Sequence, residues 1–394
     1  MKLADEITAG EGMIVSVILQ ARADKTPLVI EGGGTRRGLG RPMPAVAAAV
    51  SLRVRSGVTL YEPAEMVIGA QAGTPLAEIE RTLAEKNQIL PFEATDFRAL
   101  YGSSGEPTIG AAAACNLSGP RRIMAGAARD SLIGVRLVNG RGEIVKSGGR
   151  VMKNVTGLDL VKLNAGAFGT LGVLTEVIFK VLPKPERTAT LVLRGLDDAR
   201  AVEALSKALG SPFEVSAAAH LPGGAEGPRT LMRLENFDTS VTYRLAALQK
   251  LLADFGAADV LDDARSIALW RAIADVSPLA SGEAAVWRVS TAPSRAAALV
   301  ATLKRTLAFE HFFDWGGGLI WIACASAGDA GAGAVRAALG AQGHATLARA
   351  SEAVRLSVPV FQPVTPALEA LTRGVKASFD PDGILNPGRM YAGI

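Results

Sequence analysis

The chain contains very few of the residues that metal centres and disulfide frameworks require. Cys115 and Cys324 are the only cysteines among 394 residues, too few for a disulfide framework or an iron–sulfur cluster. The three histidines, His220, His311 and His344, stand isolated in the sequence. We therefore expect no self-contained metal site.

Long hydrophobic runs and charge of one sign are also scarce. The longest apolar runs, 13–19 and 319–325, are far shorter than the roughly 18 residues of a membrane-spanning helix. Asp5 and Glu6 stand where a signal peptide would have basic and then apolar residues, so a cytoplasmic protein is expected. The 42 basic and 38 acidic residues are dispersed, which does not favour nucleic acid as a partner.

Glycine, in contrast, is concentrated in residues 30–40. Three consecutive glycines, Gly32–Gly34, follow a short apolar strand and remove every Cβ from the turn. The backbone of such a turn can approach a ligand and direct its N–H groups at phosphate oxygens. Residues 35–37 add a hydroxyl group and two cations, which suit a pyrophosphate.

This loop has neither of the two common nucleotide-binding patterns. Arg37 stands where a G-x-G-x-x-G motif that starts at Gly32 needs its last glycine, and no Gly-Lys-Ser/Thr follows. The pattern therefore predicts a dinucleotide held on a different fold. A tight turn without a ligand is the alternative that these residues leave open.

The first part of the chain is predicted to mix helices and strands. We expect a helix over 12–22 and strands at 27–30, 57–61, 66–69, 133–138, 143–146 and 173–182. The last of these is apolar on both faces and should be central in its sheet. Thr74 is expected to cap a helix that starts at Pro75, and residues 91–107 are expected to form a long loop over the ligand.

The pattern changes after Pro183-Lys184-Pro185. Residues 189–261 read as β-α-β-β-α followed by a last strand, and residues 285–349 repeat β-α-β-β-α-β. This order predicts two ferredoxin-like halves that form one sheet. A helix over 367–378 and a tail rich in Pro, Gly and Asn follow, and the tail is expected to lie against the first domain.

Several segments together resemble one flavoprotein family, typified by vanillyl-alcohol oxidase and the D-2-hydroxy-acid dehydrogenases. Within this family the finer resemblance is to the FAD-binding E subunits of bacterial glycolate oxidases. It is densest over 25–185, sparse in the following region and good in the last fifteen residues. Its segments are 30–40, 107–122, 151–160, 171–176, 314–318 and 379–389.

The resemblance implies an α+β fold. Residues 1–185 would form a PCMH-type FAD-binding domain of two α+β subdomains, and residues 186–350 a cap domain with the two ferredoxin-like halves. Residues 351–394 would return to the FAD-binding domain. Because Gly34 and Thr35 stand where some members have a histidine that tethers the flavin, the FAD should be bound without a covalent link.

The resemblance also implies a set of FAD-binding residues. The pyrophosphate would lie on Gly32, Gly33, Gly34, Thr35 and Gly38, and the second ligand loop would supply Pro107, Thr108, Ile109 and Gly110. Residues nearer the flavin ring would be Asn116, Ser118 and Gly119, with Asn386 and Arg389 from the C-terminal turn. The strand on the adenine side would supply Gly172 and Val173.

Structural explanations compete with functional ones at several of these segments. The alternatives are a tightly packed helix start for Ala111–Ala114, surface cations for Arg121 and Arg122, a small buried side chain for Cys115, and an ion pair between Lys153 and Asp159. The family's cap motif, His-x-Gly-Asp-Gly-Asn-x-x-His, which holds substrate and metal, is not found; His311 and residues 314–318 are its nearest approach. The catalytic base and the cation for a substrate carboxylate are therefore not assigned.

The implied function is that of the FAD subunit of a glycolate oxidase complex acting on a small 2-hydroxy acid. Its partners would be a sister FAD dehydrogenase subunit and an iron–sulfur subunit, and any contact with the inner face of the cell membrane would be made through these partners. Two alternatives remain. One is a self-sufficient FAD oxidase or dehydrogenase for a small hydroxy acid or alcohol, and the other is an accessory subunit that holds FAD or only the fold.

Overall fold

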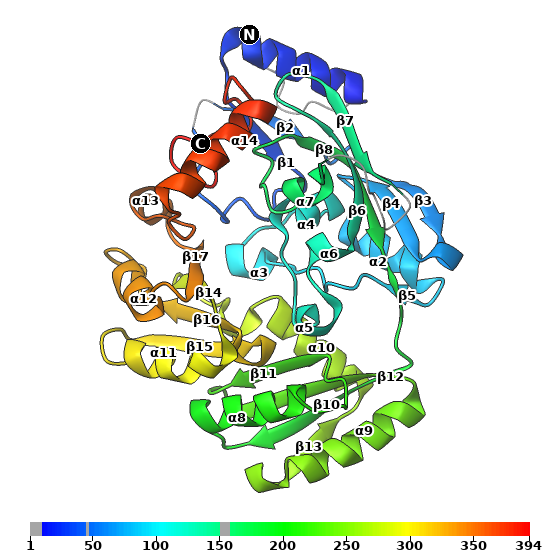
Figure 1. Ribbon diagram of the computed structural model, residues 1–394, viewed down its shortest axis with the longest axis vertical. Helices are drawn as coiled ribbons and strands as arrows, with labels where there is room; N and C mark the ends of the chain where they lie inside the picture. The colour runs from blue at the N-terminus through cyan, green and yellow to red at the C-terminus, as the bar shows by residue number, and fades with distance from the viewer. Residues whose placement is uncertain (1–9, 45–46, 150–157) are drawn as a thin grey trace.

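The computed structural model describes residues 10–44, 47–149 and 158–394. Figure 1 shows two bodies, each built on a sheet, with both ends of the described chain in the upper body. Helices and strands mix in both bodies, which confirms the predicted α+β class. In these ranges no helix has both the length and the hydropathy that a membrane span needs.

The upper body contains a five-stranded antiparallel sheet. Its strands are β3 (Val58–Glu62), β4 (Val67–Gln71), β6 (Leu132–Val138), β7 (Ile144–Gly148) and β8 (Val173–Lys180). Their order is β3-β4-β8-β6-β7. The prediction that β8 is central is confirmed, because apolar side chains on both of its faces are buried.

Shorter elements complete this body. β1 (Leu28–Glu31) and β2 (Ala48–Ser51) form a parallel pair, and β5 (Gln88–Ile89) pairs with β9 (Leu182–Pro183). The helices are α1 (Glu11–Asp24), α2 (Leu76–Ala84), α3 (Arg98–Tyr101), α4 (Ile109–Cys115), α5 (Arg122–Ala125), α6 (Ala128–Ser131) and α7 (Leu160–Asn164). Helix α3 interrupts the long loop that was predicted over 91–107.

The predicted cap of α2 is wrong by one residue. Pro75 occupies the N-cap position, and no side chain caps this helix end. The Thr74 hydroxyl instead donates to the Gln71 carbonyl oxygen and accepts from the Gly57 backbone N–H. A threonine before a proline resembles a cap in sequence, but here its hydroxyl satisfies a neighbouring turn.

The lower body is an eight-stranded antiparallel sheet made of two similar halves. The first half has β10 (Arg187–Arg194), β11 (Ala217–Leu221), β12 (Arg229–Asn236) and β13 (Ala258–Leu261), and the second has β14 (Ala285–Thr291), β15 (Phe309–Asp314), β16 (Leu319–Cys324) and β17 (Gly343–Arg349). The order is β13-β10-β12-β11-β15-β16-β14-β17, in which β11 and β15 join the halves. Each half has the strand order of a ferredoxin-like fold, which confirms the prediction.

Helices cover one face of this sheet. They are α8 (Asp198–Leu209), α9 (Asp238–Leu251), α11 (Ala296–Leu303) and α12 (Ala332–Leu339). The other face packs against α10 (Asp263–Ala274) and against loops of the upper body. The sequence pattern did not predict α10, because only its last turns carry large buried apolar side chains, Trp270 and Ile273.

The chain returns to the upper body after β17. α13 (Glu352–Ser357) and α14 (Pro366–Phe379) lead to a tail in which Leu385 pairs in parallel with Leu28 of β1. Figure 1 shows this last segment, in red, beside the blue strands β1 and β2. The tail therefore lies against the strand that leads into the glycine loop. The predicted boundaries at residues 185 and 350 remain predictions.

Four charged side chains join the two bodies. Arg121 and Glu93 of the upper body meet Arg233 and Glu235 of β12, with N–O distances of 2.7 Å for the Arg121–Glu235 and Arg233–Glu93 pairs. All four are largely shielded from solvent. The alternative that Arg121 is a surface cation is therefore wrong, because tertiary contacts bury it between two carboxylates.

Two of the three histidines, isolated in sequence, meet in the lower body. His311 Nε2 lies 3.1 Å and His220 Nε2 lies 3.7 Å from Oδ1 of Asp198, whose other oxygen pairs with Lys304. His220 is fully buried and its Nδ1 contacts the Thr230 hydroxyl at 2.9 Å. Burial lowers the pKa of His220 to about 4, so this ring is neutral at neutral pH.

This low pKa predicts a loss of stability in mild acid. Between pH 6.5 and 4 the unfolded chain binds a proton at His220 that the folded chain does not, so the free energy of unfolding falls as the pH falls. One such group changes it by up to about 1.4 kcal/mol per pH unit. His220→Leu should remove this dependence, measured as the difference from the original chain in urea unfolding at pH 4.5, 5.5 and 6.5. Arg305→Gln, at an exposed position, is the control and should keep it.

Candidate FAD site

A cavity of about 420 Å³ lies where the glycine loop, the start of α4, the turn before β8 and the C-terminal tail come together. Its wall is largely backbone and small or apolar side chains, with charged groups at a few positions. This size and lining are typical of a small-molecule or cofactor site. The cavity thus joins segments that are more than 350 residues apart in the sequence.

The two glycine-rich segments pack against each other, backbone to backbone. A Cβ at Gly33 would overlap the carbonyl oxygen of Glu106, and a Cβ at Gly105 would overlap the carbonyl oxygen of Gly33. A Cβ at Gly32 would overlap the Thr108 hydroxyl. Glycine is therefore required here for the contact between the loops, a reason that the sequence did not reveal.

Gly34 differs from its two neighbours. Its φ is +74°, a conformation that favours glycine, and a Cβ there would lie no closer than 3.6 Å to any other group, the Arg37 guanidinium. This residue lines the cavity without being enclosed by the second loop.

Several backbone N–H groups of the glycine loop have no acceptor among the described residues. From Gly33 to Gly38, no backbone N–H donates a hydrogen bond to any part of the chain that the structure describes. Thr35 and Arg36 are nonetheless buried, and Nη1 of Arg36 is also buried without a hydrogen-bond partner. Buried N–H groups normally have acceptors. A run of free donors beside a cavity fits an anionic group such as a diphosphate.

Several cations face the cavity, and most are paired with carbonyl groups rather than carboxylates. Arg36 donates to the Thr95 carbonyl oxygen, and Arg355 donates to the Gly40 carbonyl oxygen at 2.8 Å. Arg37 is the exception: it forms an ion pair with Glu31, which raises the pKa of its guanidinium. Burial lowers the pKa of Arg389 and Arg355 from that of a free arginine.

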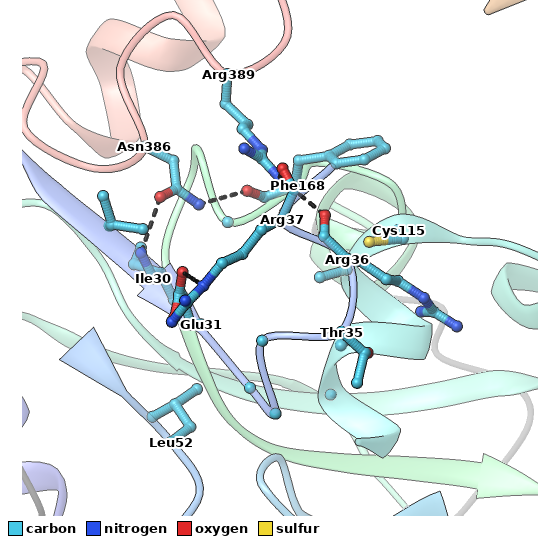
Figure 2. A pocket seen from close by; sticks show the side chains of 18 of the residues that line it. Ile30, Glu31, Thr35, Arg36, Arg37, Leu52, Cys115, Phe168, Asn386 and Arg389 are labelled. Carbon is cyan, nitrogen blue, oxygen red and sulfur yellow. Dashed lines mark hydrogen bonds and ion pairs between the residues drawn. The ribbon is translucent and has the colours of Figure 1, made fainter. Parts of the chain in front are cut away.

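The C-terminal turn holds the glycine loop in place (Figure 2). The Asn386 side chain accepts from the Ile30 backbone N–H at 2.8 Å and donates to the Phe168 carbonyl oxygen at 2.7 Å. Arg389 donates to the carbonyl oxygens of Arg36 and Arg41, both at 3.1 Å. Asn386 and Arg389 thus bind backbone, and both also line the cavity.

Most of the residues predicted to bind FAD line this cavity. They are Gly32, Gly33, Gly34, Thr35, Gly38, Thr108, Gly110, Gly172, Asn386 and Arg389. The other predicted residues lie outside the lining: Pro107, Ile109, Asn116, Ser118, Gly119 and Val173. For these six, contact with FAD remains a prediction.

The six residues outside the lining have structural roles. Asn116 ends α4 in a left-handed conformation and accepts from the Arg129 backbone N–H. The Ser118 hydroxyl accepts from the Ala128 N–H at 2.9 Å, and the Gly119 carbonyl oxygen accepts from Trp315 Nε1. The Pro107 carbonyl oxygen accepts from the Leu76 backbone N–H in the first turn of α2. Ile109 and Val173 are buried in the core.

Of the residues with a competing structural explanation, some line the cavity and others do not. Ala111, Ala114 and Cys115 line the cavity, whereas Ala112 and Ala113 are buried in the core. Asp159 caps α7 by accepting from the Lys162 backbone N–H. Lys153, like the rest of the 151–157 segment, lies outside the described residues.

The cavity also contains residues that sequence reasoning missed. Phe168, in a left-handed conformation, and Glu352 and Arg355 of α13 are part of the lining. No local sequence pattern marks Glu352 and Arg355 as site residues, because only the return of the chain after β17 brings them to the cavity. No group of three or more metal-ligating side chains is found in the described ranges.

Comparisons with known proteins support FAD as the cofactor. Residues 9–148 match the model of the FAD binding domain family, and residues 362–390 match the C-terminal domain of FAD linked oxidases. The chain is 34% identical to glycolate oxidase subunit GlcE of Escherichia coli (strain K12), over 96% of this chain and 97% of that protein. It is also 30% identical to glycolate oxidase subunit GlcD of Bacillus subtilis (strain 168), over 43% and 34% of the two chains.

A solved structure shows the same fold. p-Cresol methylhydroxylase with substrate bound superimposes with a TM-score of 0.74 at 14% identity, over 98% of this chain and 88% of that chain. At this identity the likeness concerns the fold alone. The similarity in sequence to GlcE, the two matching domains and the cavity between them show that this chain belongs to the GlcE family of FAD-linked oxidases, with FAD as its cofactor.

Proposed function

We propose that this chain is the FAD-binding subunit of a complex that oxidises glycolate or a related 2-hydroxy acid to the 2-oxo acid. The observation that carries the proposal is the similarity to GlcE, which extends over almost the whole of both chains. Because the chain has only two cysteines, it lacks the ligands for an iron–sulfur cluster of its own. A sister FAD dehydrogenase subunit and an iron–sulfur subunit are the proposed partners, and they would make any contact with the membrane.

Different residues would bind the FAD diphosphate and hold the loop in position. The free N–H groups of residues 33–38 and the hydroxyl of Thr35 would bind the diphosphate. Asn386 and Arg389 would hold the loop at its position through their bonds to backbone carbonyl and N–H groups. Cys115 and Phe168 line the part of the cavity nearest the lower body, since both also belong to the apolar cluster at its sheet.

Oxidation of a 2-hydroxy acid removes a hydride, with its two electrons, from C2 and a proton from the hydroxyl group, and bound FAD would supply the two-electron acceptor. Helix α13 contributes Glu352 and Arg355 to the wall of the cavity, on the segment by which the chain returns to the upper body. The electrons would then pass to the iron–sulfur partner.

The test is spectroscopic. The purified chain should be yellow, with bound FAD released intact by denaturation, and glycolate added without oxygen should bleach it when the partner subunits are present. Bleaching of the chain alone would support a self-sufficient enzyme instead. A yellow complex that glycolate, D-lactate and D-2-hydroxyglutarate all leave oxidised would contradict the proposal and favour an accessory subunit.

A further inference from the structure

Two arginines without an ion-pair partner among the described residues lie on either side of the boundary between the bodies. Arg122 lies in α5 of the upper body, and Arg288 lies in β14 of the lower body. Their guanidinium carbons lie 4.6 and 5.0 Å from the ring centre of one residue, Trp315. Neither side chain forms an ion pair or a hydrogen bond with the residues that the structure describes.

This arrangement differs from that of the other arginines at the same boundary. Arg121 and Arg233 each contact carboxylates of Glu93 and Glu235. Arg122 and Arg288 are partly buried, and burial lowers the pKa of both, that of Arg288 to about 10. Both remain charged at neutral pH, so two like charges share one indole, and no carboxylate of the described residues forms an ion pair with either.

Two acidic groups act on the pair without forming an ion pair with it. Burial lowers the pKa of Arg122, and the negative charge of Asp130 partly offsets this effect. Asp314 is the acidic group that acts on Arg288. Asp314 is 2% exposed and its Oδ1 accepts from the Trp315 backbone N–H at 2.7 Å. Burial raises the pKa of Asp314 to about 7, so much of it is protonated near neutral pH. Burial lowers the pKa of the neighbouring His344, and the positive charges of Arg288 and Arg122 lower it further. The cluster is thus cationic, and neither of its guanidinium groups forms an ion pair with the residues that the structure describes.

The cluster also lies at the face of the lower sheet that meets the FAD cavity. Arg288 is the cross-strand neighbour of Trp321 and Thr346. Trp315 and Trp321 belong to one apolar cluster with Cys115 and Phe168, and the last two line the cavity. The arginines are fixed on rigid elements, and the Trp315 Nε1–H is held by the Gly119 carbonyl oxygen.

We propose that Arg122 and Arg288, held against Trp315, form a carboxylate-binding site that takes the carboxylate of the 2-hydroxy acid substrate. A guanidinium presents parallel N–H donors that match the two oxygens of a carboxylate, and an aromatic face below it keeps that plane oriented. The chain lacks the His-rich cap motif of the hydroxy-acid dehydrogenases, and this pair would supply the missing cation. The inference rests on the proposed function for the identity of the acid.

The first measurement is the affinity of the full-length, FAD-loaded chain for glycolate, by calorimetry without oxygen. Arg122→Gln and Arg288→Gln should each weaken binding by about 10- to 100-fold, the usual effect of losing a charge-assisted pair of hydrogen bonds. Arg305→Gln, in an exposed arginine of the same body, is the control and should bind as the original chain does. Unchanged FAD content and melting temperature show that each variant is folded.

A neutral ligand makes the test specific for the carboxylate. Glycolamide, which lacks the charge, should bind the original chain about as weakly as glycolate binds Arg288→Gln, and the substitution should weaken it little further. Equal losses for glycolate and glycolamide would mean that the arginine has a structural role, and would overturn the proposal. So would glycolate affinities that the two substitutions leave unchanged.

Turnover by the assembled complex separates this inference from the proposed function. A raised KM for glycolate in Arg288→Gln, with assembly intact, supports both. Oxidation of glycolate with an unchanged KM overturns the carboxylate site and leaves the function standing. A complex that does not oxidise glycolate, while the chain still binds carboxylates through the two arginines, overturns the function and leaves the site. If the substitutions instead abolish assembly and leave glycolate binding intact, the arginines bind an acidic side chain of a partner and the proposal is wrong.

Discussion

Gly34→Asp is expected to abolish FAD retention, whereas Gly34→Asn should retain most of the cofactor. The position lines the cavity beside a run of unbonded backbone N–H groups, and a Cβ there meets nothing closer than 3.6 Å. Aspartate and asparagine both tolerate a φ of +74°, so the two variants differ mainly in charge. The aspartate carboxylate would repel the diphosphate and compete for its N–H donors.

The measurement is the ratio of flavin to protein absorbance after gel filtration, followed by titration of the apoprotein with FAD. The aspartate variant should bind FAD at least about 100-fold more weakly, which corresponds to the loss of roughly two charge-assisted hydrogen bonds. Stoichiometric FAD in a folded Gly34→Asp chain would show that the diphosphate lies elsewhere.

Gly33 gives the companion result, for a different reason. From the sequence alone, Gly33→Asp is expected to release FAD because it adds a Cβ and a negative charge near the phosphates. The structure shows that the Cβ alone is enough, since it would overlap the Glu106 carbonyl oxygen. Gly33→Ala should therefore lose FAD as well, while Gly223→Ala, with nothing within 4 Å of its Cβ, should behave as the original chain.

Asp380→Ala is expected to lower the free energy of unfolding by about 3–5 kcal/mol, the usual cost of breaking a buried ion pair from one side. Asp380 is 1% exposed, and its Oδ2 lies 2.6 Å from Nζ of Lys376, which is also buried. The same carboxylate accepts from the backbone N–H groups of Ile384 and Leu385. Its removal would leave an uncompensated lysine charge and two unpaired donors below the tail.

The loss of the Asp380 contacts should also affect the cofactor site, because the tail is bonded to the strand before the glycine loop. Leu385 pairs with Leu28 of β1, and Asn386 holds the Ile30 N–H at the start of the glycine loop. Asp380→Ala should therefore also weaken FAD binding, a result that urea unfolding with and without added FAD measures. Asp382→Ala is the matched control: its partner Arg22 and its own side chain are both exposed, so a cost below about 1 kcal/mol is expected. Equal costs for the two variants would contradict the argument.

The class of fold and much of the site could be predicted from local patterns. Apolar alternation located the strands of both sheets, and the repeated β-α-β-β-α-β order predicted the two ferredoxin-like halves that the strand order confirms. Three glycines after a strand predicted that the loop backbone approaches a ligand. The structure shows that Gly33 is needed for contact with the Glu106 backbone, and the approach to a ligand stays a prediction. These features depend on short-range sterics and periodicity, and a sequence displays both directly.

Only the tertiary structure decided which residues from distant parts of the sequence contact one another. The tertiary structure made Gly33 essential for packing against Glu106. It buried Arg121 between two carboxylates, whereas Arg122 and Arg288 have no carboxylate as an ion-pair partner among the described residues. A charged side chain has the same letter whether it is solvated, paired or unpaired, and burial and partners alone set its pKa and its affinity for an anion. The sequence by itself therefore determined an α+β fold with a glycine loop suited to FAD, and the packing of the two bodies determined which of its cations have carboxylate partners.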